Sequence, residues 1–554
     1  MQNDRSIKEH PLRAWLFDRL INRHGSGDSV SSPDSAIVSW INEIKAEGLP
    51  PVRGHIALLA GRNFTWVEWT VYAAVWMRKL GYAPFILFSG EEIRRIYRGK
   101  PSFRRLGSLL TYARNCLGAR DFWSKVAGIP DVLVIDIDRE QPADPVPEQH
   151  YAEFAAAWAH TTAAYDLRVE EHEEGPLKGE YEATRKEHQA RLIKTARIAE
   201  SILRRLADRH SVRRLVSYSG LVGVTPAFGE AARRLGWQVV FVETWGVKPG
   251  IMICNQDLPA LDWDQHLFLK TIDDWNDGRR KQIETFLKFQ ETNDVSDMEW
   301  LRGHLQYQRS SAEEVPDSKL RRFLSDERPV FLMAPNVIAD SGTMRRRLIF
   351  GSQREWIEKT CAFFRMHPEF KLVVRAHPAE YLLRKRVRIK TGAIAEQAAA
   401  GASNIFIVYG NDKMSTYSLL PWLRAVLVWI SNVGADLVAR NCPAISVARA
   451  KYQGMKIAHE PGSENAYFDL ITKLAALKPN TTAEQKELAK QFLSILYFQK
   501  SFHAFGPDFS ASDVRLSNQP HQADFDLFYR IIAGDLPVET RPASWSLSAG
   551  TRTQ

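Results

Sequence analysis

Two short polar turns follow apolar, strand-like segments in the second half of the chain, and their side chains are suited to holding phosphate. The first turn contains Arg375 and His377, and the second contains Ser431, Asn432 and Gly434. Ligands of open parallel α/β sheets bind outside the carboxyl ends of the strands. If both turns end strands of one such sheet, they face the same crevice. The pattern therefore predicts a nucleotide-binding site at this edge.

The turn at Ser431 and Asn432 stands between a strand and a helix. Serine and asparagine are good helix N-cap residues, and a helix N-terminus offers free N–H groups and a partial positive charge to a phosphate. A glycine at position 434 allows a ligand to approach the chain closely. The alternative is plain capping, which most helices need. The turn therefore gains functional meaning only together with His377.

His377 ends its strand and precedes Pro378, and Arg375 stands two residues before it. One interpretation is a histidine that contacts phosphate or acts as an acid, with Arg375 adding positive charge. The other is a capping histidine that only satisfies neighbouring backbone groups. The strand-end position and the flanking charges keep both interpretations open.

Glu243 closes a strand in the first half of the chain and is a candidate general base for an acceptor hydroxyl, with a salt bridge or a cap as the alternative. Asp136 and Asp138 form a D-x-D pair that could hold a metal–diphosphate, but two solvated carboxylates are the simpler interpretation. The four cysteines are far apart and show no CxxC pairing. We therefore expect no metal site and no cofactor besides the substrates.

Strand-like and helix-like segments alternate along most of the chain, which predicts an α/β protein with doubly wound parallel sheets. The strand candidates are residues 55–60, 84–88, 131–138, 214–218, 238–243, 329–334, 371–376, 404–409, 425–430 and 443–447. A long charged region without a strand candidate, about 151–210, predicts a helical insertion in the first domain. The whole order fits two Rossmann-like domains that face each other across a cleft.

The expected domain limits follow from the same pattern. They are an N-terminal helical extension at 1–50, a first Rossmann-like domain at 51–325, a second at 326–480, C-terminal helices at 481–535 and a disordered tail at 536–554.

The net charge of +9 is spread along the chain, which fits an anionic substrate or a lipid headgroup surface better than duplex DNA. We therefore expect no nucleic-acid partner. The N-terminus has no apolar signal segment, and no apolar run approaches the roughly 20 residues that span a bilayer. We expect a cytoplasmic protein, with peripheral membrane association as a further expectation.

Several motifs, in this order, resemble those of the bacterial capsule polysaccharide biosynthesis glycosyltransferases, the family of the capsular Kdo-transferases. They are Ala334-Pro-Asn-Val-Ile-Ala-Asp340, Phe350-Gly-Ser-Gln353 with Trp356, Arg375-Ala-His-Pro-Ala-Glu380, Ser431-Asn-Val-Gly434, Asn441-Cys-Pro-Ala444, Lys451-Tyr-Gln-Gly454 and Tyr467-Phe468. The resemblance covers about residues 215–500. The His-Pro and Ser motifs are also similar to those of bacterial polysialyltransferases. This chain departs from the pattern with Asn432 where serine or threonine is common and Asp436 where glutamate is usual.

The resemblance implies a GT-B fold in which the second domain binds a CMP- or UDP-linked sugar donor and the first domain binds a glycan or glycolipid acceptor. In such enzymes the His-Pro histidine and the serine motif, here His377 and Ser431, hold the donor's phosphate. It also implies work at the cytoplasmic face of the inner membrane, beside other capsule-assembly proteins. A nucleotide-sugar 2-epimerase and a non-catalytic glycan-assembly factor remain alternatives.

Overall fold

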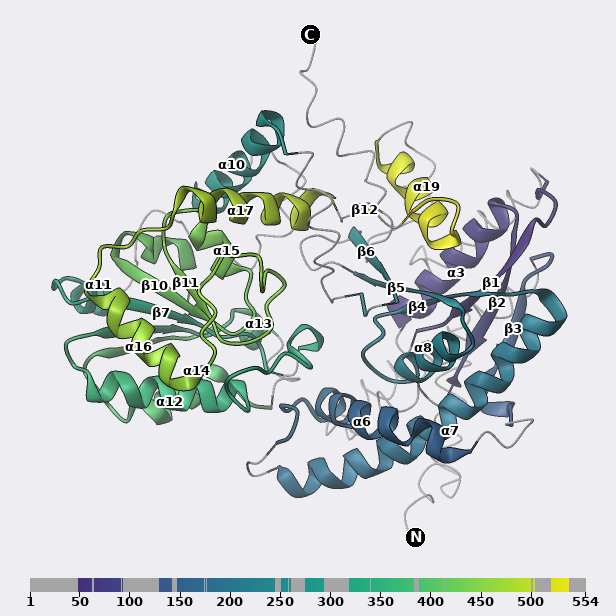
Figure 1. Ribbon diagram of the computed structural model, residues 1–554, viewed down its shortest axis with the longest axis horizontal. Coiled ribbons are helices and arrows are strands. Elements are labelled where there is room, and N and C mark those ends of the chain that lie inside the picture. The colour runs from purple at the N-terminus through teal and green to yellow at the C-terminus, as the bar shows by residue number, and fades with distance from the viewer. Residues whose placement is uncertain are drawn as a thin grey trace, which may run out of the picture. The chain divides into compact units, whose positions relative to one another are not determined.

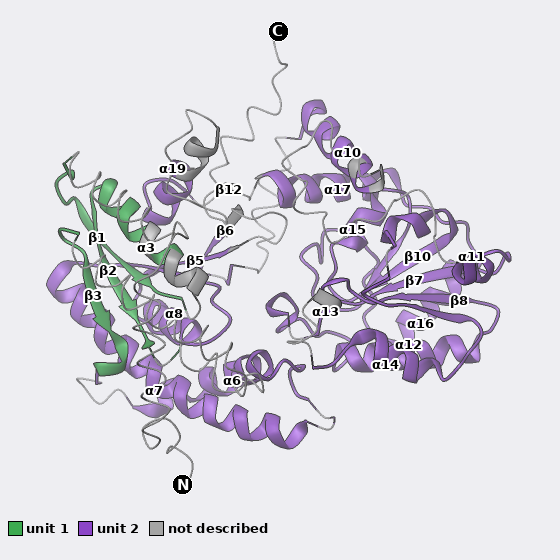
Figure 2. Ribbon diagram, turned by 180° about the vertical axis from the view of Figure 1, so that it is seen from behind, with its two compact units in different colours: residues 1–139, 509–517 green, residues 140–508, 518–554 purple. Residues whose placement is uncertain are grey.

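The computed structural model divides into two compact units (Figures 1 and 2), of which unit 1 comprises residues 1–139 and 509–517 and unit 2 comprises residues 140–508 and 518–554. The structure describes residues 48–61, 64–90, 92, 129–141, 147–173, 175, 177–244, 251–257, 259–260, 275–292, 318–338, 340–382, 388–412, 414–499, 502–503 and 520–537.

Unit 1 carries three parallel strands with a helix packed on them. Its elements are β1 (Gly54–Leu59), α3 (Phe64–Lys79), β2 (Tyr82–Phe88) and β3 (Leu133–Asp136). β2 pairs in parallel with β1 on one side and with β3 on the other. Gly81 follows α3 with a φ of 86°, a left-handed conformation that glycine adopts readily at helix ends. The three strands predicted at 55–60, 84–88 and 131–138 are confirmed.

The first part of unit 2 is a helical hairpin followed by further alternating elements. They are α6 (Ala152–Leu167), α7 (Lys178–His210), β4 (Arg214–Tyr218), α8 (Thr225–Arg234), β5 (Gln238–Thr244) and β6 (Ile251–Gln256). The α6–α7 hairpin confirms the predicted helical insertion. β4 and β5 are parallel, whereas β6 runs antiparallel to β5 and pairs with β12 (Phe502–His503). β6 is a strand that the sequence pattern did not predict.

A second alternating block forms a five-stranded parallel sheet in the order β11-β10-β7-β8-β9. Its elements are β7 (Val330–Ala334), α12 (Gln353–Met366), β8 (Lys371–Arg375), α13 (Ala379–Leu382), α14 (Thr391–Ala399), β9 (Ile405–Val408), η7 (Thr416–Trp422), β10 (Leu423–Val428), α15 (Val433–Val438) and β11 (Ala444–Ser446). The chain moves outward from β7 to β9 and returns on the other side of β7 as β10. This reversal places the switch point of a doubly wound sheet between β7 and β10. The predicted pair of Rossmann-like domains is confirmed, and the cleft between them stays a prediction.

Alternate residues of the second sheet enter two hydrophobic cores. In β7, Val330 and Leu332 belong to one core, and Phe331 and Met333 belong to the other. The first core includes α10 (Asp277–Thr292), α15 and α17 (Ala483–Ser494), and the second includes α12, α14 and α16 (Glu464–Ala475), on opposite faces in Figure 1. Burial on both faces explains why these strands are continuous apolar runs in the sequence.

The helical hairpin shares a core with the second sheet, because Val169 and Tyr181 belong to the same buried cluster as Phe331. This packing explains why the division into units falls at residue 139, whereas the predicted boundary at 325 lies inside unit 2. The predicted domain limits therefore stay a prediction.

The C-terminal helices are α16, α17 and α19 (Pro520–Ala533), and the last two lie within the range 481–535 expected for C-terminal helices. Residues 1–47 and 538–554 lie outside the described residues, and with them most of the expected N-terminal extension and tail. In the part of the chain that the structure describes, no helix combines the length and the apolar character needed to cross a membrane.

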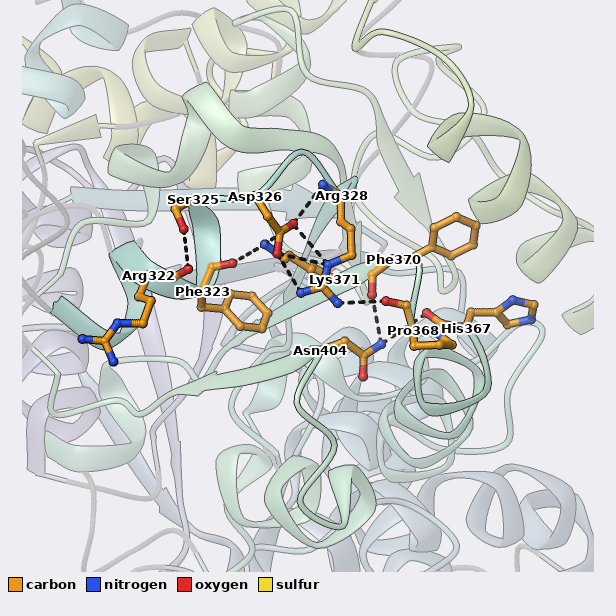
Figure 3. A network of polar contacts seen from close by, with 10 residues as sticks. All are labelled: Arg322, Phe323, Ser325, Asp326, Arg328, His367, Pro368, Phe370, Lys371 and Asn404. Carbon is orange, nitrogen blue, oxygen red and sulfur yellow. Dashed lines mark hydrogen bonds and ion pairs between the residues drawn. The ribbon is translucent and has the colours of Figure 1, made fainter.

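A lysine with no exposed side-chain surface holds the amino-terminal edge of the second sheet. Lys371 begins β8, and its ammonium group donates to the Phe323 carbonyl and pairs with Asp326 at 2.6 Å (Figure 3). Asp326 also pairs with Arg328 at 2.8 Å. Hydrogen bonds from Arg328 and Lys371 hold the pKa of Asp326 well below its usual range. The network joins the sheet to the residues after α11 (Ser318–Leu324).

Asp326→Asn removes the charged partner of the buried Lys371 ammonium. We expect the free energy of unfolding at pH 7, measured by urea denaturation, to fall by about 1–3 kcal/mol, the usual cost of a buried group that loses its partner. The depressed folded-state pKa means that the carboxylate stabilises the wild type above its unfolded pKa and that this stabilisation is lost as pH falls through the folded value. The difference between the two proteins should therefore shrink below about pH 4.

Asp277→Asn is the matched control, because the Asp277 side chain is 96% exposed and pairs with Arg280 on the helix surface. Its loss should cost less than about 0.5 kcal/mol. Equal losses in the two variants would contradict the importance of the buried lysine.

Candidate functional site

The two polar turns lie at the carboxyl edge of one parallel sheet, on either side of its central strand. His377 follows β8 and Ser431 follows β10, and both strands pair with β7. Adjacent strands are about 4.8 Å apart, so strands β8 and β10 are separated by roughly 10 Å. The site therefore surrounds the switch point, where sheets of this type bind ligands.

The turn after β7 is hydrogen-bonded to the turn after β10. The Asn336 side-chain oxygen accepts a hydrogen bond from the Ile430 N–H at 3.2 Å. In the next residue, the Ser431 hydroxyl oxygen accepts from the Val433 N–H at 3.3 Å, and the Ser431 carbonyl accepts from the Gly434 N–H at 3.1 Å. These bonds fix the backbone of the turn and leave the Ser431 hydroxyl proton to donate outward.

Asn432 precedes α15, but its half-buried side chain does not cap the helix. No hydrogen bond of this amide appears within the described part of the chain. α15 has six residues, so its dipole is small and screened within the turn. The hydroxyl of Ser431 and the amide of Asn432 are thus what this turn offers to a ligand.

Gly434 is required by a tyrosine that packs against it. A Cβ atom at position 434 would lie 2.2 Å from the Tyr452 hydroxyl oxygen. This hydroxyl donates to the Ser431 carbonyl at 2.9 Å, and Tyr452 has no exposed surface. The sequence suggested that the glycine makes room for a ligand, whereas the structure shows that it makes room for the side chain that supports the turn. A direct role of Gly434 in ligand binding stays a prediction.

Asp436 lies on α15 behind this turn and is directed into the protein. Its side chain accepts a hydrogen bond from the Tyr417 hydroxyl at 2.9 Å. Burial raises the pKa of Asp436 to about 6, while Arg440 and the Tyr417 bond act in the opposite direction. The residue therefore belongs to the support of α15.

His377 uses one ring nitrogen to bind the protein. Its Nδ1 accepts a hydrogen bond from the Ala379 N–H at 3.1 Å, so the neutral ring carries its proton on Nε2. The surrounding protein lowers the pKa of His377 and the Arg375 cation acts in the same direction, whereas Asp340 opposes them. His377 is exposed to solvent, so the loss of hydration lowers its pKa less than it would lower the pKa of a fully buried histidine. A neutral histidine with a proton on Nε2 can donate to a phosphate oxygen.

The loop after β9 is held against His377 by Arg375. The Arg375 guanidinium is buried and donates to three main-chain carbonyls of residues 409–414. Burial lowers the pKa of Arg375 to about 10. Within the same loop, a Cβ atom at Gly410 would lie 2.7 Å from the His377 carbonyl oxygen, so only glycine permits this approach. Arg375 thus shapes the site, and its direct contact with a phosphate stays a prediction.

The remaining candidates lie on other strands. Glu243 is half-buried near the carboxyl end of β5, paired with Ile253 of β6, and its role as a base stays a prediction. Asp136 accepts a hydrogen bond from the Asp138 N–H at 3.1 Å and pairs with Arg139, whereas the Asp138 side chain accepts from the Ser89 hydroxyl at 2.7 Å, so both carboxylates bind protein groups. Among the residues that the structure describes, no group of three or more His, Cys, Asp or Glu side chains could hold a metal ion.

Three residues of the site were not among the sequence candidates: Asn336, Gly410 and Tyr452. Asn336 and Tyr452 lie in motifs that carried the family resemblance, so a signal for them was present. Their partners, however, become visible only when the strand order brings β7 beside β10. Gly410 carried no signal, because a loop glycine gives no indication of which carbonyl it touches.

The fold is that of a Rossmann-like α/β protein, and its candidate ligand site surrounds the switch point of the second sheet. Residues 289–486 match the family model described as capsule polysaccharide biosynthesis protein. This segment includes the whole second sheet and both polar turns. The predicted family resemblance is confirmed. No curated protein matches the chain.

Solved structures that match the chain include two transferases from Thermosulfurimonas dismutans KpsC. Its β-Kdo 2,7 transferase is 11% identical, with 59% of this chain and 88% of that chain covered and a TM-score of 0.33. Its β-Kdo 2,4 transferase is 12% identical, with coverage of 53% and 82% and a TM-score of 0.35. The UDP-GlcNAc 2-epimerase from Neisseria meningitidis, bound to UDP-GlcNAc, is 9% identical, with coverage of 80% and 99% and a TM-score of 0.25.

The contact between Gly434 and Tyr452 predicts strong coupling between two substitutions. Gly434→Ala should destabilise the protein by about 1–3 kcal/mol, because its methyl group overlaps the tyrosine hydroxyl. Tyr452→Phe should cost about 0.5–1.5 kcal/mol through the lost hydrogen bond to Ser431. In the double variant the overlap is relieved, so the combined loss should be smaller than the sum of the single losses. A double-mutant cycle by chemical denaturation measures this coupling, and strictly additive losses would contradict it.

Proposed function

We propose that the protein is a glycosyltransferase that moves a sugar from a nucleotide-sugar donor to a capsular or other surface polysaccharide. The observation that carries the proposal is the placement of His377 and the Ser431–Asn432 turn around one switch point, within the segment that matches the capsule biosynthesis family model. His377, Ser431 and Asn432 each have a hydrogen-bond donor with no protein acceptor among the residues that the structure describes. These three donors suit the oxygens of a diphosphate or a nucleoside monophosphate.

In this proposal the second sheet binds the donor. The neutral His377 ring donates from Nε2 to the phosphate that leaves, and Ser431 and Asn432 bind the remaining phosphate oxygens. The buried Arg375 cation adds positive potential behind them. Negative charge grows on the phosphate as its bond to the sugar breaks, and fixed donors stabilise that charge without reorganising.

Glu243 is proposed as the base on the acceptor side. The new bond joins an acceptor oxygen to the anomeric carbon while the bond from that carbon to the phosphate oxygen breaks. The acceptor hydroxyl proton passes to the Glu243 carboxylate, and the electron pair of the broken bond stays on the phosphate. The acceptor is a glycan or a glycolipid, and the work takes place at the cytoplasmic face of the inner membrane, beside other capsule-assembly proteins.

A thermal-shift series with CMP, CDP, UDP and GDP tests the donor class, because a nucleotide that binds the folded protein raises its apparent stability by mass action. We expect CMP or UDP to raise the melting temperature. Incubation with the matching sugar nucleotide then separates the alternatives: a transferase extends an acceptor, whereas a 2-epimerase yields an epimer without one. Stability unchanged by every nucleotide would overturn the proposal.

Replacing His377 tests its assigned proton. His377→Ala should lower turnover about 100- to 1,000-fold, as the loss of one fixed donor to a developing charge does elsewhere. His377→Gln should keep more activity, because its amide N–H can reach the position of Nε2. Both variants should retain the wild-type circular dichroism spectrum. Near wild-type turnover in folded His377→Ala would remove the histidine from the mechanism.

Chelation tests the absence of a metal requirement. The proposed donors to the leaving phosphate are His377, Ser431 and Asn432, with Arg375 behind them, so full transfer activity is expected in excess EDTA. Complete loss of activity that a divalent ion restores would instead assign the phosphate to a metal, with Asp136 and Asp138 as the first ligands to test.

A further inference from the structure

A continuous set of hydrogen bonds leads from the helical insertion to the candidate site. Glu170 lies in the connection between α6 and α7, and its carboxylate accepts the N–H groups of Gln353 at 2.8 Å and Arg354 at 3.2 Å. These two residues open α12, whose first N–H groups have no partner inside the helix. A carboxylate supplied by the insertion therefore completes the start of a helix in the second block.

The contact continues from α12 to the switch point. The Gln353 side chain is 2% exposed and binds Asn336 twice. Its oxygen accepts from the Asn336 N–H at 2.9 Å, and its amide donates to the Asn336 carbonyl at 2.9 Å. The Asn336 side chain then accepts from the Ile430 N–H at 3.2 Å, one residue before Ser431. The two intermediate residues are thus hydrogen-bonded on both sides, Gln353 through its N–H and its side-chain amide, and Asn336 through its main chain and its side-chain oxygen.

We propose that Glu170 is a positioning residue, which acts through Gln353 and Asn336 to hold the Ser431–Asn432 turn in the conformation that binds the donor phosphate. This inference rests on the proposed function for its ligand and deepens it by assigning the insertion a part in donor affinity. Glu170 touches neither the phosphate nor the sugar.

The chemistry of Glu170 suits this position. Two N–H groups converge on it, and a carboxylate has an acceptor oxygen for each, whereas a glutamine would turn its own N–H toward one of them. Burial raises the pKa of Glu170 to about 7, while the Arg354 and Gln353 N–H groups act in the opposite direction. These helix N–H groups therefore favour the ionised form of the half-buried side chain.

Two other polar contacts between the hairpin and the second block lie outside this path. Glu180 pairs with Arg388 at 3.0 Å, and both side chains are partly exposed. Glu171 accepts from the Arg345 N–H at 2.7 Å, in the loop before α12. These bonds also hold the hairpin in place, so Glu180 provides a matched control from the same interface.

The test compares Glu170→Gln with Glu180→Gln in the full-length protein. For Glu170→Gln we expect the donor KM to rise about tenfold, the size typical of changes that act through intervening residues. The acceptor KM should stay near its wild-type value. Amide hydrogen exchange of Ile430 and Gly434 should accelerate, because both N–H groups belong to the turn that loses its support. Glu180→Gln should change neither the donor KM nor the exchange.

Gln353→Met removes the hydrogen bonds between Gln353 and Asn336 with little change in side-chain volume. It should also raise the donor KM and accelerate exchange at Ile430 and Gly434. This second variant tests the proposal even if Glu170→Gln folds poorly. Unchanged exchange at Ile430 in both folded variants would overturn the inference, and so would faster exchange with an unchanged donor KM. A failure of the proposed function is separate, since none of the nucleotides in the thermal-shift series would then raise the melting temperature of the wild type. In that case the exchange rates alone decide whether Glu170 positions the turn.

Discussion

The hydrogen bonding between strands of the second sheet ends at the carboxyl ends of the strands. The main-chain groups beyond these ends need other hydrogen-bond partners, because a buried unpaired backbone group costs free energy. Side chains meet this requirement throughout the site. Asn336 accepts the N–H of Ile430, and Tyr452 donates to the carbonyl of Ser431. Arg375 donates to the loop after β9. A binding site could form here because the backbone already needed polar side chains at this edge.

The same requirement limits which groups remain for a ligand. Most polar side chains near the switch point are occupied by the backbone, including those of Arg375 and Gln353. The Ser431 hydroxyl proton, the Asn432 amide and the Nε2 proton of His377 are the exceptions among the residues discussed. The chemistry of the site is therefore narrow, with neutral donors at the front and a buried cation behind them.

Much of the fold could be predicted from the sequence, because strands that are buried on both faces form unbroken apolar runs. β8 and β10 are examples, and the turns that follow them were found with them. β6 was missed, because Ile251–Gln256 ends in polar residues and pairs antiparallel, outside the parallel pattern that guided the prediction. The direction of Arg375 could not be predicted either. A strand buried on both faces does not reveal on which side its last residue points, and the carbonyls it binds belong to a loop more than 30 residues away. The link between Glu170 and α12 could not be predicted either. Nothing in a charged helical segment of the sequence indicates which carboxylate caps a distant helix.

The buried guanidinium of Arg375 has a consequence for the thermodynamics of ligand exchange. The guanidinium donates to three carbonyls of the loop that begins at residue 409. Movement of that loop would break these hydrogen bonds and leave the buried cation without acceptors. The wall beside His377 is then ordered before any ligand arrives, and its conformational entropy is lost during folding and not on binding. Such preorganisation leaves more of the interaction energy to appear as affinity. It also predicts a small entropic penalty for a phosphate that docks against this wall.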